Sequence, residues 1–434
     1  MPRGKGEGIT KIAVKGFKSI AEECAIDIRP LTILAGANSS GKSSIMQPLL
    51  MLKQTLEAPY DPGPLLIDGP NVQFTETEQF LSKLTTKKRT DRFRIQIKTR
   101  DTDFAHSVET TLKKGQVGFE IIEMTVEVKQ VGNPLPFKHF TLYPKMSVEE
   151  IRALGDKGPT RNDLNAVKPS RCFLGFESQD SDRFFNVTYT SVEAYIFDSV
   201  HLPGLRGTPE RIYKSISTGL RYPGTFENYT ASIIHEWQET KDKRLKTLTD
   251  TLRTLGLTGH VGTKKVGDVG IEVQVGRILH EEDEGNDLVN IADVGFGVSQ
   301  VLPVLVAVIA AEPGRLVYIE QPELHLHPRA QVVLAQVLAD AAKRGVRVVA
   351  ETHSSLLLLG IQTLVAEGKL SPELVKLHWF SRNKDGVTEV SSVDLDDAGA
   401  YGDWPMDFDD VDLKIQSRYL DAVDRLHFGK EEAS

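Results

Sequence analysis

Cysteine is scarce in this sequence of 434 residues, where only Cys24 and Cys172 occur. Two distant thiols form neither a disulfide framework nor a zinc site, so we expect a chain from a reducing cytoplasm. The first residues lack the apolar core of a signal peptide. The longest apolar run, Val301 to Ala311, is too short to span a bilayer and contains Pro303. These absences argue against secreted, disulfide-rich and membrane-spanning proteins.

Excess positive charge is also absent, because the formal net charge is −8. A protein that coats nucleic acid with a basic surface is therefore excluded, and any contact with nucleic acid needs a local patch. Two basic runs are candidates, although each is explained equally well as a solvated face. They comprise Lys87, Lys88, Arg89, Arg92 and Arg94 in the first, and Lys241, Lys243, Arg244 and Lys246 in the second.

Glycine and serine are concentrated in one stretch that fits the phosphate-loop pattern G-x-x-x-x-G-K-[ST]. An apolar run at 31–35 precedes it and a helical pattern at 45–52 follows it, as that motif requires. Backbone N–H groups and the helix N-terminus can then surround phosphate oxygens. Lys42 can reach the β- and γ-phosphates, and the Ser43 hydroxyl can bind Mg²⁺. The predicted triphosphate site comprises Gly36, Ala37, Asn38, Ser39, Ser40, Gly41, Lys42, Ser43 and Ser44.

Two further apolar runs end in polar groups. Leu316 to Glu320 has the form of a strand that brings a carboxylate to Mg²⁺ opposite a phosphate loop. The run at 347–351 ends at Glu351-Thr352-His353-Ser354, where His353 can contact the γ-phosphate. His325 and His327 alternate and can share one face, but no third metal ligand is evident beside them.

The segment from Gly295 to Gln300 precedes an apolar helix. Its glycines permit close backbone approach, and the helix N-terminus can meet an anion. Because the loop at 36–44 already serves the chain's own phosphate site, this second helix start is most useful against a nucleotide held by another subunit.

The pattern along the chain predicts five parts. Residues 1–90 form the N-terminal part of a unit with the phosphate loop, 91–225 a β-rich insert and 226–262 a helical segment. Residues 263–395 return to the first unit, which the family resemblance given below implies is an ATPase head, and 396–434 form an acidic tail. One helical face in the third part is apolar from Ile234 to Leu255, and we expect it to be core, with a dimer or arm contact as the alternative.

Together these motifs give the chain a family resemblance. Phe17-Lys18-Ser19, the phosphate loop, Gly295 to Gln300, the run Glu320 to Pro328 and Glu351 to Ser354 occur in the right order. The chain resembles ABC-type ATPases of the SMC, RecF and OLD group. It is most similar to prokaryotic "AAA family" ATPases of anti-phage defence and DNA-repair loci. The resemblance covers roughly 10–56 and 288–356, and implies an α/β P-loop ABC-type head with a mixed sheet, interrupted by a β-rich and helical insert.

The resemblance also implies cofactors and residue roles. ATP and Mg²⁺ are the expected cofactors, with the phosphate loop binding the triphosphate. Glu320 is the expected acidic partner of Mg²⁺, His353 the switch histidine and Gln73 the loop glutamine that senses the metal. The signature segment facing the other protomer's nucleotide comprises Gly295, Gly297 and Ser299.

Two positions depart from the family pattern. Gly295 stands where the signature usually begins with serine, and Gln321 stands where the catalytic glutamate is usual. An amide cannot accept the proton of an attacking water as a carboxylate does. Either Glu323 supplies the base, or hydrolysis is slow and ATP acts mainly as a dimer clamp.

We therefore expect a homodimer, or a higher even oligomer, that gates a DNA-related effector. The expected effector is a partner nuclease in trans, of which an HNH enzyme in a Septu-like pair is one form. A DNA repair or recombination ATPase of the RecF or SMC type is the alternative. A transporter energy subunit is disfavoured by the long β-rich insert. An ATPase with its own nuclease is disfavoured because no second metal cluster is apparent after His353.

Overall fold

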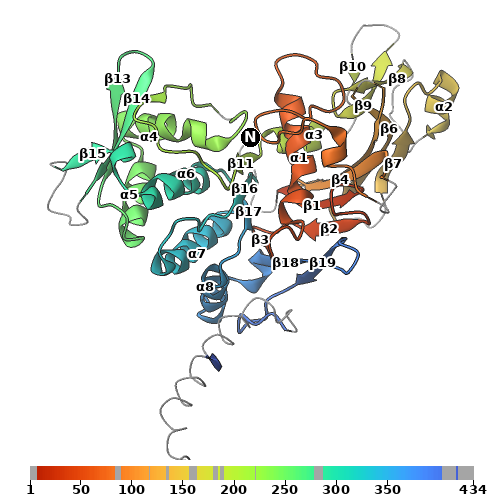
Figure 1. The fold of residues 1–434 in the computed structure, drawn as a ribbon. Helices are drawn as coiled ribbons and strands as arrows, with labels where there is room; N and C mark the ends of the chain where they lie inside the picture. The colour runs from red at the N-terminus through yellow and green to blue at the C-terminus, as the bar shows by residue number, and fades with distance from the viewer. Residues whose placement is uncertain are drawn as a thin grey trace, which may run out of the picture.

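The computed structural model describes residues 7–83, 89–116, 118–132, 136–155, 164–178, 184–185, 190–219, 221–277, 287–402 and 417–418. A mixed six-stranded sheet runs through its centre (Figure 1). Its first five strands are parallel and the last is antiparallel. In spatial order they are β11 (Val200–Leu202), β16 (Leu316–Glu320), β17 (Arg347–Glu351), β3 (Leu31–Gly36), β18 (Val375–Arg382) and β19 (Thr388–Val393). The predicted α/β fold with a mixed sheet is confirmed.

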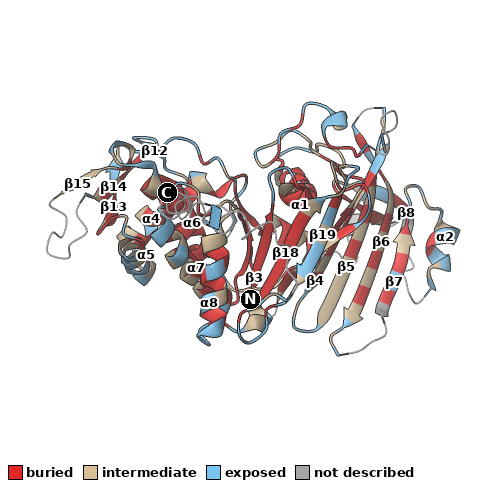
Figure 2. Cartoon of the chain, turned by 60° about the horizontal axis from the view of Figure 1, so that its bottom comes forward, coloured by how far each residue is buried: buried red, intermediate tan, exposed pale blue. Residues whose placement is uncertain are grey.

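A second six-stranded sheet is antiparallel and joins distant parts of the sequence. Its spatial order is β2 (Cys24–Asp27), β1 (Gly8–Lys15), β4 (Arg92–Arg100), β5 (Phe104–Lys114), β6 (Phe119–Gln130) and β7 (Pro136–Leu142). Buried and partly exposed residues alternate along β4 to β7, as in strands with one face on a core (Figure 2). Because β4 pairs with β1, the predicted insert at 91–225 shares a sheet with the N-terminal strands; its boundaries remain a prediction.

Smaller elements complete the two ends of the molecule. One group comprises β8 (Leu164–Ser170), β9 (Phe173–Ser178), β10 (Phe184–Phe185), α2 (Val148–Ala153) and α3 (Thr190–Phe197). The other comprises β12 (Tyr213–Lys214), β13 (Val261–Val266), β14 (Gly270–Gly276), β15 (Leu288–Asn290), α4 (Thr230–Glu239) and α5 (Lys243–Thr254). Single turns of 3-10 helix are η1 (Thr77–Gln79), η3 (Phe226–Tyr229), η4 (Ile291–Asp293) and η5 (Pro372–Leu374).

The helical pattern at 226–256 forms two helices where the sequence predicts one. Lys241 has a φ of 53°, and Asp242 then caps α5 by accepting a hydrogen bond from the Arg244 N–H at 2.9 Å. The left-handed residue and the new cap end one helix and start the next. The apolar stripe is core, as predicted, since Trp237 is 2% exposed and both Ile234 and Leu248 are fully buried.

The central sheet separates two hydrophobic cores, because alternate residues of a strand point to opposite faces. Ile33, Ile319 and Val348 belong to one core and Leu34 and Val349 to the other. The first core also holds α4, α5, α6 (Phe296–Ala310), α7 (Pro328–Lys343) and α8 (Ser355–Ala366), and the second holds α1 (Lys42–Glu57) and the antiparallel sheet. Helices α1 and α6 therefore cover opposite faces of the central sheet (Figure 1).

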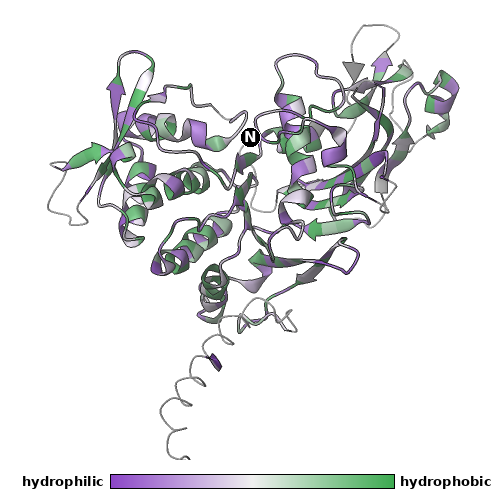
Figure 3. Cartoon of the chain, in the orientation of Figure 1, coloured by the Kyte–Doolittle hydropathy of each residue, from purple (hydrophilic) through white to green (hydrophobic). Residues whose placement is uncertain are grey.

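Burial explains why these helices form where they do. Along α7, apolar and polar residues mix so that Leu334, Ala335 and Leu338 are buried while neighbours face outward (Figure 3). Helix α6 is apolar nearly throughout and is buried from Val298 onward except at Ile309. Among the described residues, no helix is both long and apolar enough to cross a membrane.

Candidate nucleotide-binding site

The predicted phosphate loop connects the end of β3 to the start of α1. Gly41 is the N-cap of α1, and the Lys42 ammonium donates hydrogen bonds to the carbonyl oxygens of Gly36 at 3.0 Å and Ala37 at 2.8 Å. Residues 37–39 are exposed and Lys42 is buried. The loop thus folds over its own lysine, and its exposed tip precedes the α1 N-terminus.

Glycine is required at two positions of this loop because the β18–β19 hairpin packs against it. A Cβ atom at Gly36, where φ is 140°, would lie 2.2 Å from the Phe380 carbonyl oxygen. At Gly41, where φ is 111°, it would lie 2.4 Å from the Thr388 Oγ1. That hydroxyl is 2.7 Å from the Ser40 carbonyl oxygen. Thr388 therefore braces the loop, and sequence reasoning missed it because it lies far along the chain.

The Ser43 hydroxyl contacts a carboxylate that sequence reasoning did not single out. Its Oγ lies 2.8 Å and 3.0 Å from the two oxygens of Glu351, the last residue of β17. The Tyr318 hydroxyl donates to Glu351 Oε2 at 3.0 Å. Burial raises the pKa of Glu351, and the nearby charge of Glu320 raises it further, against the Ser43 hydrogen bond and the Lys42 charge. The only sequence feature that pointed to Glu351 was an apolar run, typical of a buried strand, that ends in this carboxylate.

Glu320 ends the neighbouring strand β16 and is the sheet partner of Glu351. Its Oε1 lies 3.3 Å from His201 Nε2, and its Oε2 accepts a hydrogen bond from the Gly204 N–H at 3.2 Å. Burial pushes the pKa of Glu320 up, but the hydrogen bond and charge of His201 together with the Gly204 N–H bring it below its usual value. The structure thus holds Glu320 beside Glu351, with both of its oxygens directed to partners from 201–204.

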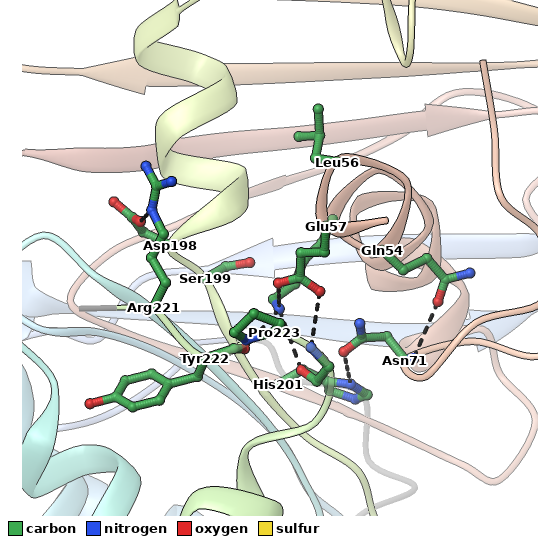
Figure 4. Close-up of polar contacts among 12 residues, drawn as sticks. Gln54, Leu56, Glu57, Asn71, Asp198, Ser199, His201, Arg221, Tyr222 and Pro223 are labelled. Atoms are coloured by element: carbon green, nitrogen blue, oxygen red, sulfur yellow. Dashed lines mark hydrogen bonds and ion pairs between the residues drawn. The ribbon is translucent and has the colours of Figure 1, made fainter. Parts of the chain in front are cut away.

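A polar chain leads from α1 to Glu320 through His201. Gln54 Oε1 accepts from the Val72 N–H at 3.0 Å and the Asn71 N–H at 3.2 Å, and Asn71 Oδ1 lies 3.2 Å from His201 Nδ1 (Figure 4). The His201 ring stacks on Tyr318 with centroids 5.4 Å apart. Gln73, the predicted metal sensor, is exposed, while Asn71 makes the indirect link to Glu320. The metal-sensing role of Gln73 therefore stays a prediction.

Helix α1 is also anchored at its C-terminal end. Lys53 and Glu57 form an ion pair with side chains 0% and 5% exposed. Lys53 also donates to the Tyr222 carbonyl oxygen at 3.2 Å, and the Gly224 N–H donates to Glu57 at 3.0 Å (Figure 4). The helix that starts at the phosphate loop is thereby fixed to the segment that leads into α4.

Glu323, the proposed base, is buried in the turn after β16, and its role as a base stays a prediction. Its Oε1 accepts hydrogen bonds from the Thr352 hydroxyl at 2.8 Å and the His353 N–H at 3.0 Å. Its Oε2 is buried and has no hydrogen-bond partner among the described residues. Burial raises the pKa of Glu323, with these hydrogen bonds and Arg206 opposing. A buried carboxylate oxygen without a donor is free to accept a proton.

Gln321 occupies a special backbone position in the same turn. Its φ is 47°, in the left-handed region that side-chain-bearing residues seldom adopt. Its N–H donates to the Glu351 carbonyl oxygen at 2.8 Å, which extends the β16–β17 pairing by one residue. A Cβ atom at Gly204 would lie 3.7 Å from the Gln321 side-chain oxygen, so the amide side chain lies close to Gly204.

His353 lies near Lys42 and the Gly36 backbone of the phosphate loop, and its contact with the γ-phosphate stays a prediction. Burial and the positive charge of Lys42 lower its pKa, while a hydrogen bond with the Gly36 backbone raises it. A lowered pKa favours the neutral imidazole near pH 7, which can donate one hydrogen bond and accept another. The structure therefore brings Lys42, Ser43, Glu323, Glu351 and His353 together around one loop.

The predicted signature segment lies at the start of α6, on the other face of the sheet. Gly295 is the N-cap and is exposed. Phe296 is 52% exposed, and its ring is tilted by 35° against that of His325 with centroids 5.9 Å apart. The Ser299 hydroxyl donates to the Phe296 carbonyl oxygen at 3.1 Å and is buried. Gly295 is thus presented to solvent, Gly297 is half-buried and Ser299 is buried.

Arg206 ties this helix to the turn after β16, a link that the sequence did not reveal. Its guanidinium donates to the Gln300 carbonyl oxygen at 3.0 Å and the Gln321 carbonyl oxygen at 3.0 Å, and also to Glu320 O at 2.6 Å. Gln300 returns a hydrogen bond to the Gly207 carbonyl oxygen at 2.9 Å. Burial lowers the pKa of Arg206 to about 10, with nearby glutamates opposing. One buried cation therefore connects α6 with the carboxylate turn.

The metal interpretation of His325 and His327 gains no support. His327 is the N-cap of α7, where its Nδ1 accepts a hydrogen bond from the Arg329 N–H at 3.3 Å. No group of three or more His, Cys, Asp or Glu residues suited to a metal ion occurs in the part of the chain that the structure describes.

Comparison with known proteins places this site in a class. Residues 8–195 match the family model "AAA ATPase domain", and residues 158–359 match "AAA domain, putative AbiEii toxin, Type IV TA system". A search of curated proteins finds no match. The two ATPase models together span residues 8–359, so the resemblance to ATPases that the motifs indicate is confirmed.

One solved structure supports the fold. The head domain of an SMC protein bound to the C-terminal winged-helix domain of ScpA aligns over 90% of this chain and 99% of that one, with 12% identity and a TM-score of 0.50. SMC heads from Thermotoga maritima (89% and 99% covered, 13% identity, TM-score 0.40) and Pyrococcus furiosus (89% and 96%, 12%, 0.46) also align. At such identities the likeness concerns the fold alone.

Proposed function

We propose that two copies of this chain close on two ATP molecules, hydrolyse them slowly, and thereby control a separate nuclease that acts on DNA. The position of two helix N-termini carries this proposal. Helix α1 starts at the phosphate loop, while α6 starts at the exposed Gly295 on the opposite face of the central sheet. A helix N-terminus attracts anions, so that of α6 suits the phosphates held by another copy.

The donor set near Ser43 fits the predicted Mg²⁺. In nucleotide sites this ion is held through one or two carboxylates together with substrate phosphates, and it prefers oxygen ligands. The Ser43 hydroxyl and the Glu320 and Glu351 carboxylates supply such oxygens. When bound, Mg²⁺ neutralises charge on the phosphates. Lys42 would exchange its hydrogen bonds to the loop carbonyls for hydrogen bonds to the phosphates. These are stronger for a buried ammonium, because phosphate oxygens are charged and carbonyl oxygens are not.

Slow hydrolysis follows from the proposed division of roles after β16. Gln321 cannot take a proton from water, whereas the free oxygen of Glu323 can. We assign the base to Glu323 and the γ-phosphate contact to His353, which donates its backbone N–H to that same carboxylate at 3.0 Å. This hydrogen bond ties the proposed base to the backbone of the proposed phosphate sensor.

The effector is proposed to act in trans. The described residues contain no further carboxylate or histidine cluster for a nuclease metal. The SMC head aligned above is bound to a domain of a second protein, and we expect a docked partner here, of which an HNH nuclease is one candidate. Purified chain with plasmid, linear or single-stranded DNA, or RNA, and Mg²⁺ or Mn²⁺ should produce no cleavage. Cleavage lost on mutating this chain's own carboxylates would contradict this assignment.

Direct contact with nucleic acid is a weaker part of the proposal. Lys87 and Lys88 lie outside the described residues. Arg92 pairs with Asp91 at 2.8 Å, and Arg94 pairs with Glu109 at 3.0 Å. In the second run, Arg244 pairs with Asp242 at 2.6 Å. These cations are already partly compensated, so any affinity should be modest and should fall steeply with salt.

Light scattering with and without ATP and Mg²⁺ tests the closure. ATP should drive association of the wild-type chain, and Gly297→Arg should block the ATP-driven step. A Cβ atom at Gly297 meets only ordinary contacts at 3.5 Å, so its backbone accepts a side chain. Gly219→Arg is the matched control, because a Cβ atom there meets no described atom within 4 Å. Association indifferent to both ATP and Gly297→Arg would refute the clamp.

A further inference from the structure

The strand order singles out Glu351 as the carboxylate next to the phosphate loop. β17 lies directly beside β3, whereas β16 lies one strand further away. Neighbouring strands are about 4.8 Å apart, so the end of β16 is roughly twice as far from the loop strand as the end of β17. Glu351 ends the nearer strand and Glu320 the farther one, and they are paired neighbours in the sheet.

The hydrogen bonds point the same way. The Ser43 hydroxyl of the phosphate loop is within 3.0 Å of both Glu351 oxygens, whereas the Glu320 oxygens contact His201 and Gly204, which lie outside that loop. A hydroxyl has one proton and two lone pairs, so Ser43 can donate to Glu351 and still offer a lone pair to a cation. The Tyr318 hydroxyl donates to Glu351 from within the core.

The charges leave room for a cation. Glu351 is 6% exposed and is a sheet neighbour of Glu320, so two carboxylates stand together in a largely buried place. Ser43 and Tyr318 are neutral donors to Glu351. The nearby basic groups are His201, which contacts Glu320, and Lys42, whose hydrogen bonds go to the loop carbonyls. Buried like charges are costly unless a positive charge compensates them.

We propose that Glu351 is the principal protein carboxylate holding the divalent cation at the phosphate loop, acting with Ser43, while Glu320 supports it from the adjacent strand. This rests on the proposed nucleotide site and adds a metal-holding residue to it. The competing explanation is that Glu351 only fixes the Ser43 rotamer. The two differ in charge dependence, because a neutral amide oxygen can still accept from Ser43 and Tyr318 but attracts a cation far less.

Electron paramagnetic resonance of Mn²⁺ with a non-hydrolysable ATP analogue separates these explanations. Glu351→Gln should weaken Mn²⁺ binding at least tenfold, and more than Glu320→Gln does. Analogue affinity in EDTA should be kept or improved, because a negative charge near the phosphates is removed. Glu351→Asp, which keeps the charge, should retain more Mn²⁺ affinity than Glu351→Gln. Glu373→Gln is the matched control, since Glu373 is exposed just before Val375, at the opposite end of the sheet.

Two results would overturn the proposal. One is Mn²⁺ affinity of a folded Glu351→Gln variant within twofold of wild type. The other, should that variant fail to fold, is equal Mn²⁺ affinity of wild type and Glu351→Asp together with a greater loss in Glu320→Gln. Absence of analogue binding by the wild type, with or without metal, would instead remove the proposed nucleotide site itself. The two failures are therefore distinguishable.

Discussion

At the phosphate loop, Lys42 and Ser43 already have hydrogen-bond partners inside the chain, whereas the start of α6 is turned to solvent. A Cβ atom at Gly295 would meet no described atom within 4 Å, and Phe296 is 52% exposed. The first region has the residues that the proposed nucleotide site needs. The second is an exposed helix N-terminus, which favours anions. This contrast supports the proposal that one chain carries two complementary half-sites that meet between copies.

The largest effect is expected at the base, because it would act on the chemical step alone. Glu323→Gln should lower turnover by about 10²- to 10⁴-fold, the range typical of general base catalysis, with ATP affinity little changed. Single-turnover hydrolysis and calorimetry measure the two quantities. Glu373→Gln serves as the control for charge. A brisk wild-type rate that survives Glu323→Gln would place the base elsewhere.

Loss of the loop lysine should weaken the binding half directly. Lys42→Ala removes a cation beside the phosphates and should lower ATP affinity roughly 100-fold, corresponding to about 3 kcal/mol. The fold should survive, because the lost partners are only two loop carbonyls, one of them on the exposed Ala37. Calorimetry and thermal melting test both statements, with Lys384→Ala on the exposed β18–β19 turn as control. Unchanged nucleotide affinity would refute the site assignment.

A smaller gain is expected from restoring the missing carboxylate. Gln321→Glu should raise turnover roughly 3- to 10-fold, or about 1 kcal/mol in the barrier. The gain is modest because Gln321 has a φ of 47° and its side chain lies beside Gly204. A carboxylate in this position would have the charge of a base but would not be directed at the attacking water. Steady-state hydrolysis in Glu323→Gln and wild-type backgrounds distinguishes a restored base from a general change.

The pH profile should show the smallest change, a displaced acidic limb. A base works when deprotonated, and burial raises the pKa of Glu323 above its ordinary value. Activity should therefore be lost on acidification at a higher pH than an exposed glutamate would give, and be retained as pH rises. Turnover from pH 4 to 9 under saturating ATP measures this. The Glu323→Gln residual rate should lack that limb.

Much of this arrangement follows from sequence patterns, and the rest depends on strand order. The phosphate loop, the strand ending at Glu320 and the one ending at Glu351 were visible because an apolar run followed by polar groups marks the end of a buried strand. Periodicity does not say which strand lies beside β3, so the sequence does not reveal that Glu351 contacts Ser43. The metal role of Glu320 stays a prediction. His201, Arg206 and Thr388 were missed because each comes from a distant segment without a motif.

The hydrophobic pattern also fails to show the break between helices α4 and α5. The stripe from Ile234 to Leu255 keeps its period across residues 240–242, so periodicity alone indicates one helix. The chain turns there because Lys241 adopts positive φ and Asp242 caps α5, local events that a hydrophobic pattern does not record. The hydrophobic pattern therefore predicted the buried face correctly but missed the break between α4 and α5.

Mixed-variant complementation tests the two half-sites most directly. Lys42→Ala lacks a working phosphate loop and Gly295→Arg lacks a working α6 start, so each alone should be nearly inactive. In a 1:1 mixture, random pairing gives heterodimers with one intact composite site, and turnover should recover to about one quarter of wild type. A mixture no more active than the sum of its parts, or a fully active Gly295→Arg protein alone, would contradict the account.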